Sequence, residues 1–140
     1  MSDTAPDLAD LANLLSASDN YRVQRRLMPR STVTPPDGTP TKTALLIDVE
    51  TTGLDLQKDE IIELAMISFT YSLDGRVFEI GETFQRFQEP SAPISPEITR
   101  ITGITDAMVA GHTIDVAEVA AFARPAALVI AHNAGFDRRF

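Results

Sequence analysis

The sequence predicts an α/β fold built on a mixed sheet, in which an antiparallel meander is followed by a parallel strand, with flanking helices. Three observations predict it. Three strand-like apolar runs follow one another with short turns between them, helix start signals come next, and a fourth apolar run over residues 127–131 leads into a last helix.

The meander is expected over residues 44–88. Residues 44–49 form a short apolar run, and residues 61–71 form a longer one that ends at the turn-forming residues 72–75. Residues 76–88 alternate apolar and polar side chains, as a half-buried strand does. Short turns between consecutive strands predict antiparallel pairing.

Helix signals follow the meander. Ser95 precedes Pro96, a combination typical of a helix N-cap and first helical position. Two more helices are expected to begin at Thr105 and at Asp115. Asn133 begins a further helix so close to Phe140 that we expect the fold to be C-terminally incomplete.

Composition limits the classes of function. The 140 residues correspond to about one domain, and a hydrophobic content of 44% with 23% charged residues excludes general disorder. A net charge of −8 argues against a basic stripe that grips long duplex nucleic acid. Without cysteine the chain has no disulfide, thiolate nucleophile or cysteine zinc site. It shows neither a secretory signal peptide nor a membrane-spanning run, so we expect a cytoplasmic protein without a membrane partner.

The chain divides into a helical extension over residues 1–30, a Pro/Gly-rich linker over 31–42 and a domain over 43–140. Apolar residues in the extension recur at helical spacing and predict one or two short helices between residues 7 and 29. The simpler interpretation is a helix that packs on the flank of the domain. The alternative is a helix that docks on a partner protein.

The most specific feature is the pair Asp48 and Glu50 at the end of the first strand. Residues two apart in a strand share a face, so both carboxylates project together and repel each other unless a cation lies between them. Such hard oxygen ligands suit Mg²⁺ or Mn²⁺. Two acids at a strand end can also simply face solvent. The metal interpretation is favoured because residues 44–47 look like a buried strand, and α/β proteins place their sites where such strands end.

A second polar cluster follows residues 128–131, which also look like a buried strand. If Asn133 caps the next helix, Asp137 lies four residues on and faces the same side. A fourth strand parallel to the first and next to it would then bring Asp137 to Asp48 and Glu50 in one pocket.

Four ordered segments resemble the DEDD superfamily of metal-dependent 3′–5′ exonucleases (DnaQ-like, DEDDh-type), particularly the proofreading epsilon subunit of bacterial DNA polymerase III. These segments are Asp48–Leu54, Ile61–Ala65, Ile101–Thr105 and His132–Asp137. The resemblance covers nearly all of residues 43–140. It implies a ribonuclease H-like fold and two-metal hydrolysis of phosphodiester bonds with Mg²⁺ or Mn²⁺.

The resemblance also implies roles for individual residues. Asp48 would bridge two metal ions, Glu50 would complete the nucleophile-side ion, and Asp137 would hold the leaving-group ion. The residues expected to bind the substrate are Thr51, Leu54, Ile101, Thr102 and Asn133. The implied partner is the 3′ end of single-stranded nucleic acid, DNA more than RNA, with a DNA polymerase subunit as a possible second partner in proofreading or repair.

The chain departs from the family pattern in one respect. The family's third motif, a His followed five residues later by an Asp, does not occur before Phe140, and neither His112 nor His132 matches it. We therefore expect residues 1–140 alone to be inactive.

Three other functions share part of this pattern. A non-catalytic nuclease-like scaffold or polymerase-binding module would not need the clustered acids, and an exonuclease of short RNA oligonucleotides would share residues 52–55. A phosphotransferase with an aspartyl nucleophile is disfavoured, because it needs a second Asp where this chain has Glu50.

Overall fold

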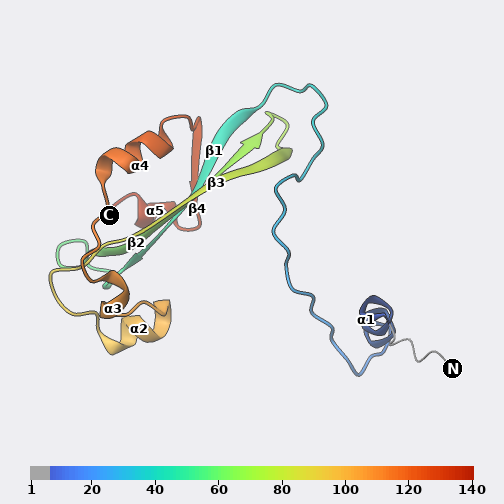
Figure 1. Ribbon diagram of the computed structural model, residues 1–140, viewed down its shortest axis with the longest axis horizontal. Coiled ribbons are helices and arrows are strands. Elements are labelled where there is room, and N and C mark those ends of the chain that lie inside the picture. Colours follow the sequence, from blue (N-terminus) through green and yellow to red (C-terminus); the bar gives the residue numbers. More distant parts are fainter. Residues whose placement is uncertain (1–6) are drawn as a thin grey trace.

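The computed structural model describes residues 7–140 (Figure 1). The part of the predicted helical extension that falls on residues 1–6 lies outside the described residues. The helices and strands in chain order are α1 (Leu8–Ser16), β1 (Lys42–Thr51), β2 (Ile61–Tyr71), β3 (Val77–Phe87), α2 (Pro96–Thr102), α3 (Asp106–Val109), α4 (Val116–Ala123), β4 (Leu128–Ala131) and α5 (Ala134–Asp137).

The four strands form one mixed sheet in the order β3-β2-β1-β4. β1 pairs antiparallel with β2 and β2 pairs antiparallel with β3, while β4 runs parallel to β1. The α/β mixed-sheet prediction, with its meander and its parallel fourth strand, is confirmed. The reason is general: short turns join antiparallel neighbours, whereas the crossover through α2, α3 and α4 returns the chain parallel to β1.

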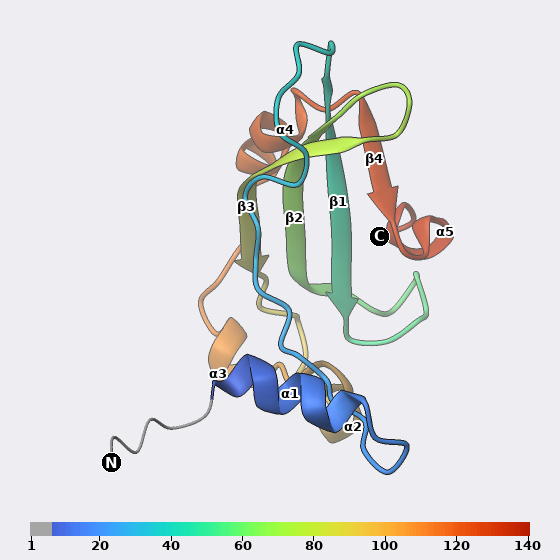
Figure 2. The same ribbon diagram turned by 90° about the vertical axis from the view of Figure 1, so that its right-hand side faces the viewer.

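One face of the sheet is covered. Leu45, Val49 and Met66 are buried on this covered face, and Phe84 of β3 joins them. Phe122 of α4 packs against Phe84 with ring centroids 5.5 Å apart. Helix α4 therefore closes the main hydrophobic core over this face (Figure 2).

The opposite face, here named the open face, is much more exposed. Leu46 is 45% exposed in β1, and its partner Ile130 in the edge strand β4 is 38% exposed. The prediction that residues 44–47 and 128–131 are fully buried strands is therefore wrong for Leu46 and for most of β4. An apolar run shows that a strand forms, but it does not show whether another element covers each face.

A second core lies beyond the end of the sheet where β1 ends. Ile62 is buried there with Ile94, Ile104 and Val109, so α2 and α3 pack at this end (Figures 1 and 2). The predicted cap is confirmed, since the Ser95 side chain accepts a hydrogen bond from the backbone N–H of Ile98 and Pro96 opens α2. The two other helix starts predicted from the sequence also form, as α3 and α4.

The extension contains a single described helix, α1, and residues 21–30 are not helical. Helix α1 buries none of its residues, and Figure 1 shows it away from the sheet. The interpretation that it packs on the flank of the domain is therefore wrong. A short amphipathic helix gains its stability mainly from a packing partner, and among residues 7–140 the apolar side of α1 has none. Among the described residues no helix is both long and apolar enough to cross a membrane.

Residues 31–39, here named the strap, hydrogen-bond to the outer edge of β3. The backbone N–H of Val33 donates to the Phe78 carbonyl over 2.7 Å, and the Ile80 N–H donates to the Ser31 carbonyl over 2.7 Å. Arg76 then holds Asp37, with Nη1 2.6 Å from Oδ2. Hydrogen bonds from Thr39 and from Arg76 keep the pKa of the Asp37 carboxyl well below its ordinary value.

Candidate active site

Three carboxylates share the open face near the end of β1. Asp48 and Glu50 alternate with buried residues and so share this face, as their spacing predicts. Glu63 of β2 lies directly opposite Glu50 in the antiparallel register. Burial raises the pKa of Glu50 above its ordinary value, and the negative charges of Asp48 and Glu63 raise it further. A cation at this place would relieve the repulsion.

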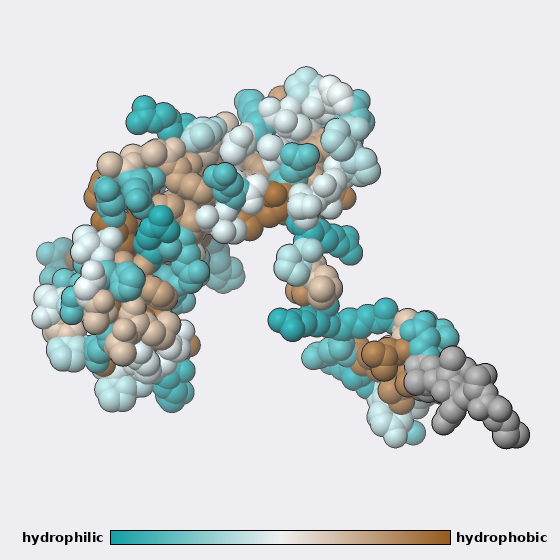
Figure 3. Space-filling view, viewed as in Figure 1, coloured by the Kyte–Doolittle hydropathy of each residue, from teal (hydrophilic) through white to brown (hydrophobic). Residues whose placement is uncertain are grey.

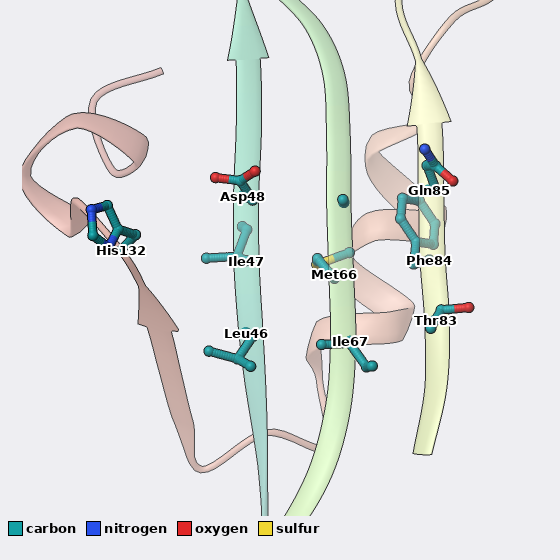
Figure 4. Close-up of a pocket in the computed structure, with 10 residues that line it drawn as sticks. Leu46, Ile47, Asp48, Met66, Ile67, Thr83, Phe84, Gln85 and His132 are labelled. Carbon is teal, nitrogen blue, oxygen red and sulfur yellow. The ribbon is translucent and has the colours of Figure 1, made fainter. Parts of the chain in front are cut away.

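A hollow of about 650 Å³ lies over the open face beside these acids. Figure 4 shows Asp48 at its edge and His132, from the turn after β4, on the neighbouring side. Leu46 and Ile67 form part of its apolar floor. The hollow joins an apolar surface to a carboxylate and an imidazole, a mixture typical of ligand sites.

Asp137 does not lie beside Asp48 and Glu50 on the open face. It ends α5 and lines a separate small pocket with Val129 and Ala131. Those two residues pair with Leu45 and Ile47, which point away from the open face. Among residues 7–140 no three His, Cys, Asp or Glu side chains are grouped so that they could hold a metal ion. The expectation that Asp48, Glu50 and Asp137 meet in one pocket is therefore not met in this structure.

The physical reason lies in how α5 packs. The aromatic ring of Phe136 contacts the core of the covered face, and this contact places α5 on that side of the sheet. Asn133 occupies the N-cap position as predicted, but its side chain makes no capping hydrogen bond. The helix begins where the sequence indicates, while its rotation about β4 depends on packing that sequence spacing does not show.

The loop after β1 is tightly organised. Thr51 is buried and its hydroxyl donates to the Gly53 carbonyl over 2.5 Å. The Thr52 hydroxyl donates to Asp59 Oδ1 over 3.1 Å, and Asp59 Oδ2 accepts from the Asp55 N–H over 2.8 Å. Leu54 stands at the tip of this loop, 83% exposed. The threonines thus shape the turn, and Leu54 is free to contact a ligand.

The two predicted substrate-binding residues of α2 also differ from each other: one is exposed, and the other is held by hydrogen bonds within the structure. Ile101 is 65% exposed, so its side chain is not part of the core and is open to a ligand. The Thr102 hydroxyl donates to the Ile98 carbonyl over 2.9 Å and accepts from the Ile104 N–H over 3.1 Å, so this side chain is engaged in the end of the helix. Both residues lie at the end of the molecule where β1 ends (Figure 2).

The sequence pattern does not indicate a role in the site for Glu63, Gln85 or His132. Glu63 belongs to an apolar strand, and only the register of β1 with β2 shows that it faces Glu50. Gln85 of β3 donates a hydrogen bond to Glu63 and fixes its position. His132, in the turn after β4, is exposed and lines the hollow. The parallel register, which pairs Ile47 with Ala131, could have placed His132 beside Asp48.

The mixed sheet, with acids at the end of its first strand, is a ribonuclease H-like α/β fold. Exonucleases of known structure share this fold. The sequence profile of the RNase_T family, described as Exonuclease, matches residues 45–140. The chain therefore belongs to this exonuclease family of hydrolases.

Relatives that this chain resembles include PolC-type DNA polymerases. The chain is 40% identical over 100 residues to the PolC-type DNA polymerase III of Caldanaerobacter subterraneus, covering 69% of this chain and 7% of that protein. It is 38% identical over 101 residues to the PolC-type DNA polymerase III of Bacillus subtilis, covering 71% of this chain and 7% of that protein. The chain thus spans only about 7% of the length of these relatives.

Solved structures with the same fold are exonucleases. E. coli exonuclease I, in a complex with single-stranded DNA, superposes with a TM-score of 0.55 at 23% identity, covering 70% of this chain and 22% of that one. Exonuclease I of Methylocaldum szegediense gives a TM-score of 0.52 at 27% identity, covering 70% of this chain and 22% of that one. At 23% identity, the similarity to E. coli exonuclease I shows only that the two proteins share a fold.

Proposed function

We propose that this domain belongs to a 3′–5′ exonuclease that removes nucleotides from DNA 3′ ends with the help of two divalent metal ions, Mg²⁺ or Mn²⁺. The observation that carries the proposal is the pair Asp48 and Glu50 on one face at the end of β1, within a domain of the exonuclease family. The DNA polymerase relatives and the exonuclease I complex with single-stranded DNA support DNA as the substrate.

The donor set suits hard divalent cations. Asp48 and Glu50 offer carboxylate oxygens on a shared face, and the pKa of Glu50 is raised by its burial and then by the negative charges of Asp48 and Glu63. Bound ions of this kind lower the pKa of a coordinated water and neutralise charge on the attacking and leaving oxygens. Asp137 is the third proposed ligand. It follows the strand parallel to β1, and it reaches the pair only if α5 turns toward the open face.

The exposed side chains around this site are the proposed substrate contacts. Leu54 projects from the loop after β1 and would pack against the last base, and Ile101 presents an apolar surface on α2. Asn133, whose side chain has no capping bond, would support the scissile region. The backbone N–H of Thr51 is proposed to bind the terminal 3′ hydroxyl, and Thr102 would line the nucleotide pocket.

We propose that the general base and a fourth carboxylate come from a His and an Asp outside residues 1–140, so that this segment alone is inactive. A DNA polymerase partner, which the PolC-type relatives support, is part of the same proposal, and so is a cytoplasmic location.

Calorimetric titration with Mn²⁺ tests the metal site. Wild-type residues 1–140 should bind Mn²⁺ weakly, and Asp48→Asn and Glu50→Gln should each abolish detectable binding because each removes a ligand charge. Glu82→Gln is the matched control, since Glu82 is an exposed glutamate of β3 outside the acid group. Unchanged binding in the Asp48 variant would refute the proposed site. Strong metal-dependent digestion of single-stranded DNA by residues 1–140 would refute the expected inactivity.

A further inference from the structure

A positively charged segment lies between α1 and the strap. Residues 21–30, here named the arginine segment, contain four of the 12 basic residues and no acid. Their backbone is extended rather than helical, and the four arginines are exposed. Arg25 donates to Asn13 Oδ1 over 3.0 Å, and within residues 7–140 none of the four forms an ion pair with a carboxylate. Their charge is therefore available to a ligand.

The rest of the chain has the opposite sign. Residues 41–140 hold eight basic and 15 acidic residues, and the acids Asp48, Glu50 and Glu63 gather at the candidate active site. A polyanionic substrate gains little attraction from such a surface until metal ions neutralise it. The arginine segment is the densest positive charge that the chain offers to phosphates.

We propose that the arginine segment binds the phosphates of single-stranded nucleic acid several nucleotides before the 3′ end that enters the active site. This inference rests on the proposed function and deepens it. Arginine offers planar forked donors that match phosphate oxygens. Tyr21 begins the segment with its side chain 63% exposed, and an exposed aromatic ring beside arginines is the combination that binds unpaired bases by stacking.

The strap sets the reach of the segment. Ser31 is bonded to Ile80 on the outer edge of β3, while Asp48 lies two strands away in β1. With strands about 4.8 Å apart and a rise of about 3.4 Å per residue, the anchor lies about 20 Å from Asp48. Ten extended residues span up to about 33 Å. At about 3.4 Å per stacked nucleotide, the segment would contact phosphates about six nucleotides from the reacting end.

The neighbouring helix argues against a membrane surface as the partner. Helices that lie on anionic membranes carry Lys or Arg on their polar face. Helix α1 has apolar residues such as Leu8 and Leu14 exposed, but it has no basic residue and carries Asp10 in its first turn. Figure 3 shows this apolar surface on α1 at the far end of the molecule from the sheet. The arginines are thus placed off the helix, on a chain that is free to follow a strand of nucleic acid.

The test compares two double variants by fluorescence anisotropy with a labelled dT20 oligonucleotide in EDTA. Arg22→Gln/Arg26→Gln should weaken binding about tenfold and reduce the slope of log K against log salt by about 1.4, since each phosphate contact to a single strand contributes about 0.7. Lys42→Gln/Arg124→Gln removes the same charge from exposed positions of the domain and should change neither quantity. Arg22→Lys/Arg26→Lys should retain most of the affinity and the full slope.

The outcomes separate this inference from the proposed function. EDTA removes metal ions and prevents cleavage, so the binding result does not depend on whether the metal site exists. Equal affinity of both Gln double variants for dT20 would overturn the inference while leaving the exonuclease proposal intact. If the Arg22/Arg26 variant lost binding to phosphatidylserine vesicles and kept its affinity for dT20, the segment would be a membrane site and the inference would be wrong.

Discussion

Replacing Glu50 by glutamine should stabilise the metal-free protein. Glu50 is half-buried, lies directly opposite Glu63 and shares its face with Asp48, so two like charges act on it. A like-charge pair directly opposite in an antiparallel sheet costs up to about 1 kcal/mol. We therefore expect Glu50→Gln to raise the free energy of unfolding in EDTA by about 0.5–1 kcal/mol, which corresponds to about 2–8 °C in Tm.

The pH dependence gives the same prediction a second readout. Because the pKa of Glu50 is raised above its ordinary value of 4.5, the folded protein binds a proton more readily than the unfolded chain does. The contribution of Glu50 to stability therefore rises as pH falls through the window between the raised pKa and 4.5, and it is lost again as pH rises. Glu50→Gln should remove this rise in stability.

Thermal unfolding followed by circular dichroism, in EDTA and in Mn²⁺, measures both effects. The Tm of wild type should rise on addition of Mn²⁺, and the Tm of Glu50→Gln should rise less. The difference in Tm between the two proteins should therefore become smaller or change sign. Glu82→Gln serves as control, because Glu82 has no acid opposite it in the paired register and should respond like wild type. A lower Tm for Glu50→Gln than for wild type in EDTA would refute the reasoning from charge repulsion.

Three further predictions concern the scaffold. Asp37→Asn should speed hydrogen exchange at the Val33 amide at neutral pH, because the ionised Asp37 carboxyl stabilises the strap. Since the pKa of Asp37 is lowered, this contribution is fully present above the ordinary 3.8 and decreases as pH falls below it, and the effect of the substitution should shrink with it; unchanged exchange at neutral pH would contradict the prediction. Gly53→Ala places a Cβ 2.6 Å from the Asp59 carboxyl carbon and should cost about 1–3 kcal/mol in urea unfolding, whereas Gly135→Ala, with nothing nearer than 3.7 Å, should be close to neutral. Ser95→Ala should cost about 1 kcal/mol in the same assay through the lost cap of α2, and an unchanged urea midpoint would exclude that role.

The sheet could be predicted because its signals are local. Alternating apolar residues and short turns fix three antiparallel strands, and the spacing of Asp48 and Glu50 places both on one face without any knowledge of tertiary contacts. The cap at Ser95 is likewise readable within four residues. These features depend on backbone geometry and hydrogen bonding among neighbours in the chain.

The remaining features depend on partners far apart in the chain. Glu63 joins the acids only through the register of β1 with β2, which an apolar run does not specify. Asp137 lies away from Asp48 because Phe136 packs into the covered face, and the rotation of a four-residue helix is set by such packing. The exposure of β4 and of α1 reflects which surfaces other elements cover, a property of the whole fold.

The strap has a consequence for the ways in which the sheet can grow. Exposed strand edges recruit further strands, and proteins commonly block such edges to avoid aggregation. On the β3 side, residues 31–34 already occupy backbone groups of Phe78 and Ile80, and their pairing is reinforced by the bond between Arg76 and Asp37. Within residues 7–140, β4 pairs with β1 alone. An added strand can therefore join beside β4 without displacing any backbone bond, whereas beside the first residues of β3 it would have to displace the strap.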